Sequence, residues 1–308
     1  MQTATSIHWL TLSDWTLMAI TGPQAKAFLQ GQVTCDIREL TPGESRLGAH
    51  CDPKGRMQVS FRALATGEEQ VLLRLPRSMV EATTASLGKY IVFSKAELSD
   101  ETGHYRLRGL CGPDARKQLT EALAEPAPEP GQWVAHEGGF IVTLDEQRYE
   151  CWLTEAQAEL LDRHFGQPTA GDTQWRLLDI RAGLGEVLPQ TLGLFTPQLL
   201  NFTQIGGVSF RKGCFTGQEI VARLHYKGKL KQRMRRLSAA CSDPDALVPG
   251  TLLHNGDGKK VGELVMAAPS GPGTCECLAV VEDSALEGEI QIDHTFPAEP
   301  LSLPYTVE

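Results

Sequence analysis

The sequence predicts an α+β chain that ends in a small all-β domain folded as a barrel. Up to about residue 165, strand-like and helix-like segments follow one another in mixed order, which favours α+β over a parallel doubly wound sheet. After Ala240 the segments are short, strand-like and separated by glycine turns, which is typical of a small barrel. With 308 residues, 41% of them hydrophobic, the chain can form real cores, and wholesale disorder is excluded.

Helices are predicted where start signals precede amphipathic stretches. Gly22-Pro23 places a proline at the first position of one helix, and Gly112-Pro113-Asp114 starts another. The predicted helices span residues 24–29, 79–90, 115–123 and 155–165, and the predicted strands span residues 57–64, 70–75, 140–144 and 149–153. Three alternate prolines between Glu125 and Gly131 exclude helix and strand alike, so this segment is predicted to be an extended loop.

The C-terminal barrel is predicted from a hairpin and the strand that follows it. Asn255-Gly256-Asp257-Gly258 joins strand-like segments at residues 252–253 and 261–265, as a glycine turn joins two strands. A second turn at residues 269–273 precedes a strand over residues 275–281. In that strand, Cys275 and Cys277 share one face.

Several classes of protein are disfavoured by what the sequence lacks. It contains no Gly-x-x-x-x-Gly-Lys-Ser/Thr phosphate loop, no Gly-x-Gly-x-x-Gly, no His-Glu-x-x-His and no Gly-x-Ser-x-Gly. The eight histidines show no metal-ligand spacing, so no metal site is predicted. The sequence has no apolar run of the roughly 18 residues that cross a membrane, and its first residues do not read as a secretory signal. We therefore expect a cytoplasmic protein whose eight cysteines are reduced thiols.

Positive charge is concentrated in one segment of an acidic chain. The net charge is −9, yet Arg211–Arg236 holds nine Lys or Arg against the single acid Glu219, which leaves −17 on the remainder. Such a segment indicates a specific anionic partner. One hypothesis is an RNA-binding strand with a cationic stripe of Lys227, Lys229, Lys231, Arg233 and Arg235. Direct nucleic-acid binding is nevertheless not expected, because no RNA-binding motif accompanies the stripe and Tyr226 alone interleaves it.

The densest chemical signal precedes this stripe. Thr216 and Glu219 have the Thr-x-x-Glu spacing of a capping box, which predicts a helix from Thr216 through Leu224. Cys214 would then lie just before a helix N-terminus, beside Arg211 and Lys212, where a thiolate is favoured over a thiol. An equally weighted interpretation is a buried structural cysteine in a tight turn.

Together these segments resemble a known family. Lys212-Gly213-Cys214-Phe215-Thr216-Gly217-Gln218-Glu219 is similar to the signature of the YgfZ proteins, which are related to the T-protein, the aminomethyltransferase of the glycine cleavage system. The resemblance extends along the chain through the blocks Phe28–Asp36, Cys51–Met57, Lys89–Lys95, Asp179–Gly183, Pro197-Gln198 and Leu303-Pro304-Tyr305.

The resemblance implies a T-protein-like ring of three domains around a central folate-binding channel, with ferredoxin-like α/β domains and a C-terminal β-barrel. It implies a discontinuous folate-binding domain from residues 1–46 and 172–232, an inserted domain over residues 47–171, and the barrel over residues 233–308. The discontinuity is not visible in the residue patterns themselves.

The resemblance also implies a function. Family members bind folate, and they are linked to the maintenance of iron–sulfur enzymes, to tRNA modification by methylthiolation, and to regulation of the replication initiator DnaA. Tetrahydrofolate or a derivative is the expected cofactor, and the expected indirect partners are iron–sulfur enzymes that act on tRNA. Trp15 and Trp175 match the two tryptophans associated with folate, whose flat ring stacks well on an indole. Arg223 and Lys227 would form a basic rim for its acidic tail.

The alternative is a tetrahydrofolate-dependent aminomethyl transferase. That chemistry needs a positioned carboxylate near the folate amine. Asp36, Asp52 and Glu219 are available, but none matches the transferase's acid, so an accessory protein is favoured over an enzyme. In the accessory role Cys214 would act as a thiolate ligand or nucleophile, or would shape the channel. A monomer is expected.

Overall fold

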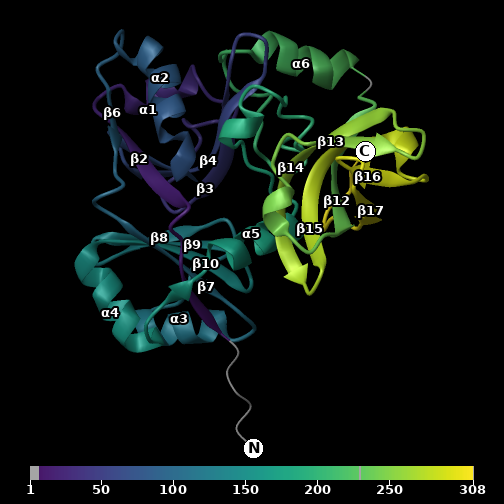
Figure 1. Cartoon of the computed structure of the whole chain (residues 1–308). Coiled ribbons are helices and arrows are strands. Elements are labelled where there is room, and N and C mark those ends of the chain that lie inside the picture. Colours follow the sequence, from purple (N-terminus) through teal and green to yellow (C-terminus); the bar gives the residue numbers. More distant parts are fainter. Residues whose placement is uncertain (1–6, 229, 308) are drawn as a thin grey trace, which may run out of the picture.

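The computed structural model describes residues 7–228 and 230–307, and the chain builds two sheets and a closed barrel (Figure 1). The first sheet is antiparallel, with the strand order β3-β4-β5-β2-β6. Its strands are β2 (Trp15–Thr21), β3 (Ser45–Cys51), β4 (Met57–Gly67), β5 (Gln70–Pro76) and β6 (Glu97–Asp100). Helices α1 (Ala25–Gln30) and α2 (Val80–Ile91) pack on it.

The second sheet has the order β11-β1-β7-β10-β9-β8 and is antiparallel except for the pair β1–β11. Its strands are β1 (His8–Thr11), β7 (Arg106–Cys111), β8 (Trp133–His136), β9 (Gly139–Asp145), β10 (Arg148–Leu153) and β11 (Thr169–Ala170). Helices α3 (Ala115–Leu123) and α4 (Glu155–Phe165) bury their apolar stripes against one face, where Leu119 and Leu161 are fully buried beside Tyr149.

The C-terminal part is the predicted barrel, closed in the order β12-β15-β14-β13-β16-β17. Its strands are β12 (Gln232–Ala240), β13 (Leu252–Asn255), β14 (Lys260–Gly271), β15 (Thr274–Glu282), β16 (Ile290–Ile292) and β17 (Phe296–Leu301). Cys275 and Cys277 share the inner face of β15 and belong to the barrel core, as their spacing predicts.

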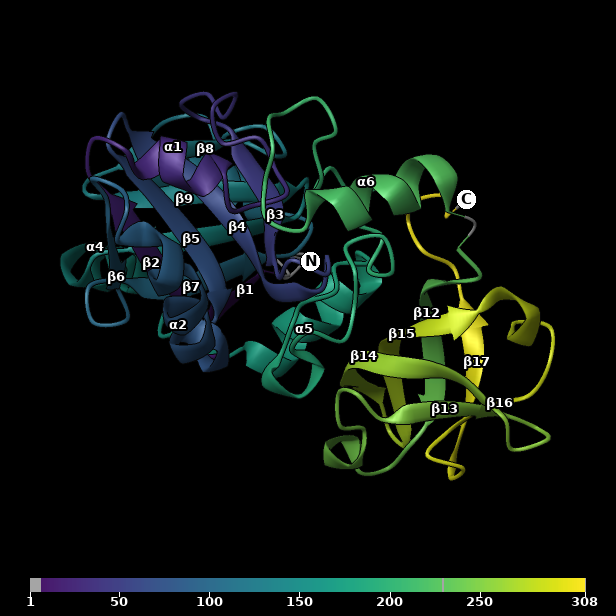
Figure 2. The ribbon, with the colours of Figure 1, turned by 90° about the horizontal axis from the view of Figure 1, so that it is seen from above.

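Helix α5 (Asp172–Arg181) lies where the three parts meet (Figure 2). Its Trp175 belongs to a core formed by residues of both sheets, and Ile180 packs in the core of the first sheet. At its C-terminal end, Arg181 pairs with Glu276 of the barrel at 2.8 Å. The remaining helix, α6 (Gln218–Lys227), lies along an outer edge beside the first sheet and the barrel, and short 3₁₀ turns occupy Arg77–Met79, Pro189–Thr191, Pro244–Ala246 and Asp283–Ala285.

The predicted fold class is confirmed: the chain is α+β with a closed barrel at its C-terminal end. The predicted helices agree with α1 to α4 within two residues at each end. Of these, α1 and α3 begin after the Gly-Pro signals that the sequence shows. The second sheet is discontinuous in sequence, because β1 precedes the whole of the first sheet and pairs with β7, which follows it. The predicted domain boundaries after residues 46 and 171 stay a prediction. No helix among the described residues is long and apolar enough to span a membrane.

Candidate functional site

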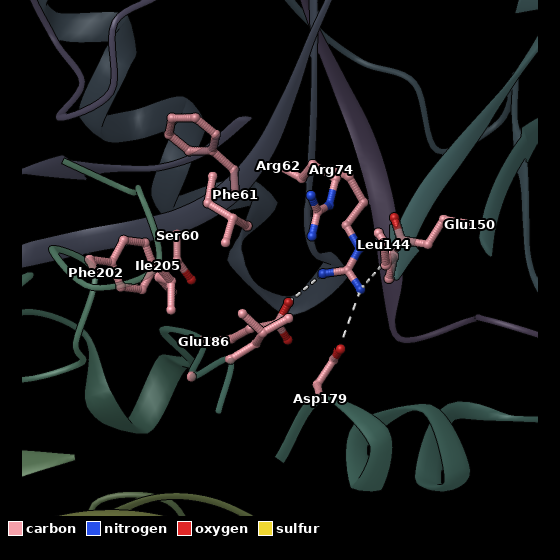
Figure 3. A pocket seen from close by; sticks show the side chains of 13 residues that line it. Ser60, Phe61, Arg62, Arg74, Leu144, Glu150, Asp179, Glu186, Phe202 and Ile205 are labelled. Atoms are coloured by element: carbon pink, nitrogen blue, oxygen red, sulfur yellow. Dashed lines mark hydrogen bonds and ion pairs between the residues drawn. The ribbon is translucent and has the colours of Figure 1, made fainter. Parts of the chain in front are cut away.

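A small cavity of about 30 Å³ lies where the two sheets meet α5 (Figure 3). Apolar walls and a cluster of charges share this space. It is lined by Leu47, Ser60, Phe61, Arg62, Arg74, Leu144, Glu150, Asp179, Leu184, Gly185, Glu186, Phe202 and Ile205. Because these residues come from β3, β4, β5, β9, β10, α5 and the loops at 184–186 and 202–205, the cavity depends on the tertiary fold.

Arg74 of β5 is the central cation of the cavity. Its guanidinium donates to the carboxylate of Glu186 and approaches Glu150 Oε1 at 2.9 Å and Asp179 Oδ2 at 3.9 Å. Burial by itself would lower the pKa of Arg74, but the three facing carboxylates raise it. Its Nε is buried without a hydrogen-bond partner, so one donor of this side chain is left unused.

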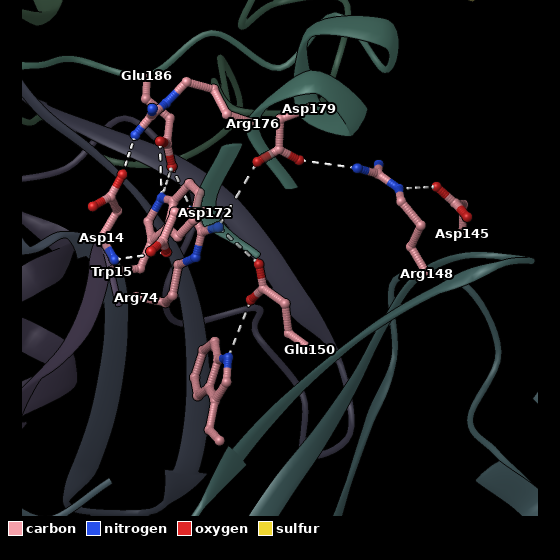
Figure 4. Close-up of polar contacts among 11 residues, drawn as sticks. Asp14, Trp15, Arg74, Asp145, Arg148, Glu150, Asp172, Arg176, Asp179 and Glu186 are labelled. Atoms are coloured by element: carbon pink, nitrogen blue, oxygen red, sulfur yellow. Dashed lines mark hydrogen bonds and ion pairs between the residues drawn. The ribbon is translucent and has the colours of Figure 1, made fainter. Parts of the chain in front are cut away.

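Asp179 of α5 links this cluster to the second sheet (Figure 4). Its Oδ1 accepts a hydrogen bond from Arg148 Nη1 at 3.0 Å, and Arg148 in turn donates to Asp145 at 2.6 Å. Burial raises the pKa of Asp179 to about 6, although Arg148 and Arg74 both oppose the rise. This carboxyl therefore gains a proton at a higher pH than an ordinary aspartate.

Glu186 connects the cavity to a larger groove. Both of its carboxylate oxygens accept from Trp15 Nε1 at 2.9 Å, and the Arg74 guanidinium lies 4.7 Å from the centre of the Trp15 ring. Glu186 and Trp15 also line a groove of about 620 Å³, which reaches the barrel. The groove is bounded by two further arginines, Arg77 and Arg176, and by residues of the barrel that include Met266.

The two predicted folate tryptophans occupy different surroundings. Trp15 lines the groove, whereas Trp175 lines neither the cavity nor the groove. The Trp175 ring is fully buried against Gly109, where a Cβ would lie 2.6 Å from it, and the Arg148 guanidinium is 5.9 Å from its centre. Its Nε1 has no hydrogen-bond partner. Stacking of a ligand on Trp175 therefore has no open face here, because Gly109 lets the indole pack directly on β7. Trp9, Trp133 and Trp152 are core residues, as expected.

The segment Lys212–Glu219, called the signature segment below, lies on the first sheet. Lys212 is buried, and its Nζ donates to the carbonyls of Val33 at 2.5 Å and Cys35 at 2.8 Å, 5.0 Å from the Phe215 ring. Burial lowers the pKa of Lys212 to about 8, with Cys35 and Asp36 opposing the shift. The side chain thus fixes the signature segment to the chain that follows α1.

The predicted capping box does not form. Helix α6 begins at Gln218 with Gly217 as its N-cap, and no side chain caps it. Thr216 instead donates from its hydroxyl to Gln32 Oε1 at 3.1 Å, and its backbone N–H bonds to the carbonyl of Gly31. Gly217 adopts φ +83° against the backbone of Asp52 and Gly55, a conformation that favours glycine. The N-cap position of α6 is therefore occupied by Gly217 and not by Thr216.

Three sequence blocks of the resemblance meet in space. The block Phe28–Asp36 accepts hydrogen bonds from the side chains of Lys212 and Thr216. The tip of the β3–β4 hairpin, at Asp52–Gly55, packs against Gly217 and Ile220. The hairpin tip is itself fixed by Asp52 Oδ1, which accepts from the N–H groups of Lys54 and Arg56. The three blocks therefore form one packed unit, and Gly213 and Cys214 are exposed on its surface.

Cys214 is the exposed thiol of the molecule. Of the eight cysteines, all of which the structure describes, seven are buried and Cys214 is exposed. This overturns the interpretation of Cys214 as a buried structural cysteine. Cys214 lies four residues before α6, whose first turn already begins at Gln218. Neither Trp15 nor Trp175 makes a hydrogen bond, ion pair or ring contact with the signature segment among the described residues.

The predicted cationic stripe is wrong as a strand. Lys227 is the last residue of α6, β12 begins only at Gln232, and Lys229 lies outside the described residues. Within β12, Arg235 of the stripe pairs with Asp283, and the neighbouring Arg236 pairs with Glu276, so acidic partners offset part of the positive charge here. Arg223 and Lys227 are exposed on α6 and line neither the cavity nor the groove.

The three carboxylates considered for a transferase have other surroundings. Asp36 is buried and accepts from Gln30 Nε2 and from the N–H groups of Arg38 and Glu39, and Asp52 caps the hairpin tip. Glu219 is exposed on α6. The carboxylates of the cavity are the ones that sequence reasoning missed. Of these carboxylates, the sequence draws attention only to Asp179, which lies in the block Asp179–Gly183 of the resemblance. No spacing in the sequence connects that block with Arg74 or Glu150.

No group of three or more histidine, cysteine, aspartate or glutamate side chains in the described part of the chain has the arrangement of a metal site.

Known proteins resemble this chain in both sequence and fold. Residues 2–129 match the family model described as the GCVT N-terminal domain. A tRNA-modifying protein YgfZ of Escherichia coli O157:H7 is 36% identical over 238 residues, which is 76% of this chain and 72% of that protein. Its counterpart from Shigella sonnei is 35% identical over the same shares.

Among solved structures, the glycine cleavage system aminomethyltransferase T from Bartonella henselae superposes with a TM-score of 0.73. It is 18% identical in sequence, and the match covers 97% of this chain and 86% of that one. The likeness extends over both sheets and the barrel, and shows that the three parts together have a T-protein-like fold.

Proposed function

The chain belongs to the family of the YgfZ tRNA-modifying proteins, and from this premise we propose that it is a folate-binding accessory protein that supports iron–sulfur enzymes in the modification of tRNA. The observation that carries the folate part is the position of Glu186, a mostly buried carboxylate held by Trp15 and Arg74 between the cavity and the groove. The role in tRNA modification is supported by the relatives, which are named as tRNA-modifying proteins.

The groove beside the cavity has the size and the lining for a folate. Its volume of about 620 Å³ lies in the range of small-molecule sites, and Leu188 and Met266 give it apolar walls beside Glu186. The small cavity behind Glu186 adds the unpaired Nε of Arg74 as a buried polar group. The acidic tail would meet Arg77 and Arg176, which line the groove, in place of the cations on α6.

In this proposal the bound folate supplies one-carbon or reducing equivalents, and the chain supplies the site. Glu186 would accept hydrogen bonds from the ring, since its position is fixed by Trp15 and Arg74 before a ligand arrives. Arg74 forms ion pairs with both Glu186 and Glu150 and so holds the two carboxylates in place. The exposed Cys214, on the signature segment, would serve the partner enzyme as a thiolate ligand or nucleophile.

Complementation tests this proposal in its cellular form. In a strain that lacks its own family member, the wild-type chain should restore methylthiolated tRNA. Cys214→Ala should fold normally and fail to restore it. Full restoration by Cys214→Ala removes the thiol from the mechanism, and no restoration by the wild-type chain contradicts the proposal.

Asp179 favours a second candidate, the one-carbon transferase. Such a reaction needs a carboxyl near the folate amine, and Asp179 is a cavity carboxyl whose pKa burial raises to about 6. Its contacts with Arg148 and Arg74 also give it a structural role. Formation of methylenetetrahydrofolate from an aminomethyl donor by the wild-type chain, lost in Asp179→Asn, would establish the transferase.

A further inference from the structure

We propose that the outer side of α6 and the loop before it bind a single-stranded segment of RNA. This α6 surface is defined by Phe210, Arg223, His225, Tyr226 and Lys227. The choice of RNA over other polyanions rests on the proposed function in tRNA modification, while the binding itself is argued from the geometry that follows.

The α6 surface holds a stacking platform for planar groups. Phe210 and His225 are stacked, with ring centres 3.8 Å apart and an interplanar angle of 12°. Tyr226 meets both rings edge-on, at 5.9 Å from Phe210 and 4.8 Å from His225. The Tyr226 side chain is 69% exposed, although large aromatic residues are usually covered. An exposed, preformed aromatic group is what an unpaired base requires for stacking.

Cations lie on the same side of the helix. Arg223, Tyr226 and Lys227 are spaced three and four residues apart, so they share one face of α6. Both cations are exposed and neither forms an ion pair with a residue that the structure describes. Unpaired cations beside an aromatic platform suit the phosphates that flank a stacked base.

A polar groove continues the platform. It has a volume of about 370 Å³, and His225 of the platform is part of its lining. Its lining residues are Gln198, Thr203, Gln204, Leu224, His225, Gly228, Leu230 and Arg233. Thr203 and Gln204 bring a hydroxyl and an amide, groups that bond to base edges and to a ribose 2′-hydroxyl.

This combination favours a nucleic acid over an acidic peptide. A peptide would use the cations but not the parallel pair of rings, whereas an oligonucleotide uses both at once. The sequence alone does not reveal the platform, because Phe210 and His225 are 15 positions apart and only Tyr226 lies among the cations. The proposed RNA site therefore departs from the expectation, drawn from the sequence, that the chain does not bind nucleic acid directly.

Fluorescence anisotropy of the full-length protein with a labelled single-stranded RNA of about 12 nucleotides, within the range that one such site covers, tests the proposal. The wild-type protein should bind saturably. Tyr226→Ala should weaken binding about tenfold, as the loss of one stacked base does. Phe93→Ala, which removes an 86% exposed aromatic residue elsewhere, is the matched control and should leave binding unchanged.

The charge component has its own readout. Lys227→Gln should lower the slope of log affinity against log salt by about 0.7, the value for one phosphate contact on a single strand. Lys117→Gln, which removes an exposed lysine on α3, should not change the slope.

Three outcomes overturn the proposal. They are the absence of RNA binding by the wild-type protein, equal binding by Tyr226→Ala, and equally tight binding of the DNA of the same sequence, which would remove the assignment to RNA. Restoration of tRNA modification in the complementation strain is a separate measurement. If it succeeds while RNA binding fails, the α6 proposal falls and the proposed function stands.

Discussion

The central cavity and the signature segment are built in opposite ways. The cavity gathers single charged residues from distant strands, as Arg74 of β5, Glu150 of β10 and Asp179 of α5 show. The signature segment is eight consecutive residues that present an exposed thiol. The first depends on packing between two sheets and α5, whereas the second is held by contacts of Lys212 and Gly217 with the chain after α1 and with the β3–β4 hairpin. The comparison teaches that the same chain can hold a charged cavity that only the whole fold creates and an exposed thiol that one short segment presents.

The largest expected difference between the two regions is the cost of losing a cation. Arg74→Met leaves Glu150, Asp179 and Glu186 buried without their central partner. Breaking a buried ion pair in this way should lower the free energy of unfolding by about 3–5 kcal/mol. Arg223→Met on exposed α6 is the matched control and should change it by less than about 0.5 kcal/mol. Urea unfolding measures both. Equal effects would contradict the contrast between a cooperative cluster and an exposed helix.

The second difference concerns backbone geometry within the signature segment. Gly217→Ala places a Cβ against the Asp52 carbonyl and forces alanine to φ +83°, which should cost about 1–3 kcal/mol of stability. Gly213→Ala has open space around it and should cost less than about 0.5 kcal/mol. Thermal unfolding of the pair separates them. Similar melting temperatures would show that the hairpin tip does not constrain the segment.

A pH series sharpens the comparison at Lys212. Because its folded pKa of about 8 lies below the ordinary lysine value of 10.5, the native state holds fewer protons than the unfolded chain between these values. The contribution of Lys212 to stability is therefore largest above pH 10.5 and is lost as pH falls toward 8. The stability of the wild type relative to Lys212→Met should rise with pH in this window, by up to about 1.4 kcal/mol per pH unit. A flat difference would mean that the buried amine keeps its ordinary pKa.

The smallest energetic effect belongs to the exposed thiol. Cys214→Ala should change the free energy of unfolding by less than about 0.5 kcal/mol, because the side chain is on the surface. Under native conditions iodoacetamide should alkylate Cys214 before any buried cysteine, and mass spectrometry after unfolding should find all eight thiols reactive. Rapid native labelling of Cys35 or Cys51 would show that the first sheet opens more readily than its packing indicates.

Sequence reasoning succeeded where the signal is local. Helices α1 and α3 and the β13–β14 hairpin follow from glycine and proline signals, and helix α2 follows from the spacing of its apolar residues. The strands β1 and β2 were missed, because each is a short apolar run whose partners, β7 and β5, lie far along the chain. The capping box failed because Thr216 bonds to Gln32, and a tertiary contact of this kind leaves no trace in the spacing Thr-x-x-Glu.

The candidate site divides in the same way. Lys212–Glu219 could be singled out because eight residues carry the pattern together. Arg74, Glu150 and Glu186 could not, since the pairing of a strand, a second strand and a loop across 112 positions is decided by tertiary packing. The resemblance implies that Trp175 contacts folate, and this stays a prediction; in the structure its ring is buried against Gly109.

The central claim is that a reduced folate binds at the junction of the cavity and the groove, beside Glu186. Calorimetric titration of the purified protein with tetrahydrofolate under reducing conditions tests it most directly. The account predicts saturable binding by the wild type, affinity lowered about tenfold or more in Glu186→Gln by loss of a charged hydrogen-bond acceptor, and unchanged affinity in the exposed control Glu159→Gln. Absence of binding at millimolar tetrahydrofolate, or equal affinity in all three proteins, would contradict it.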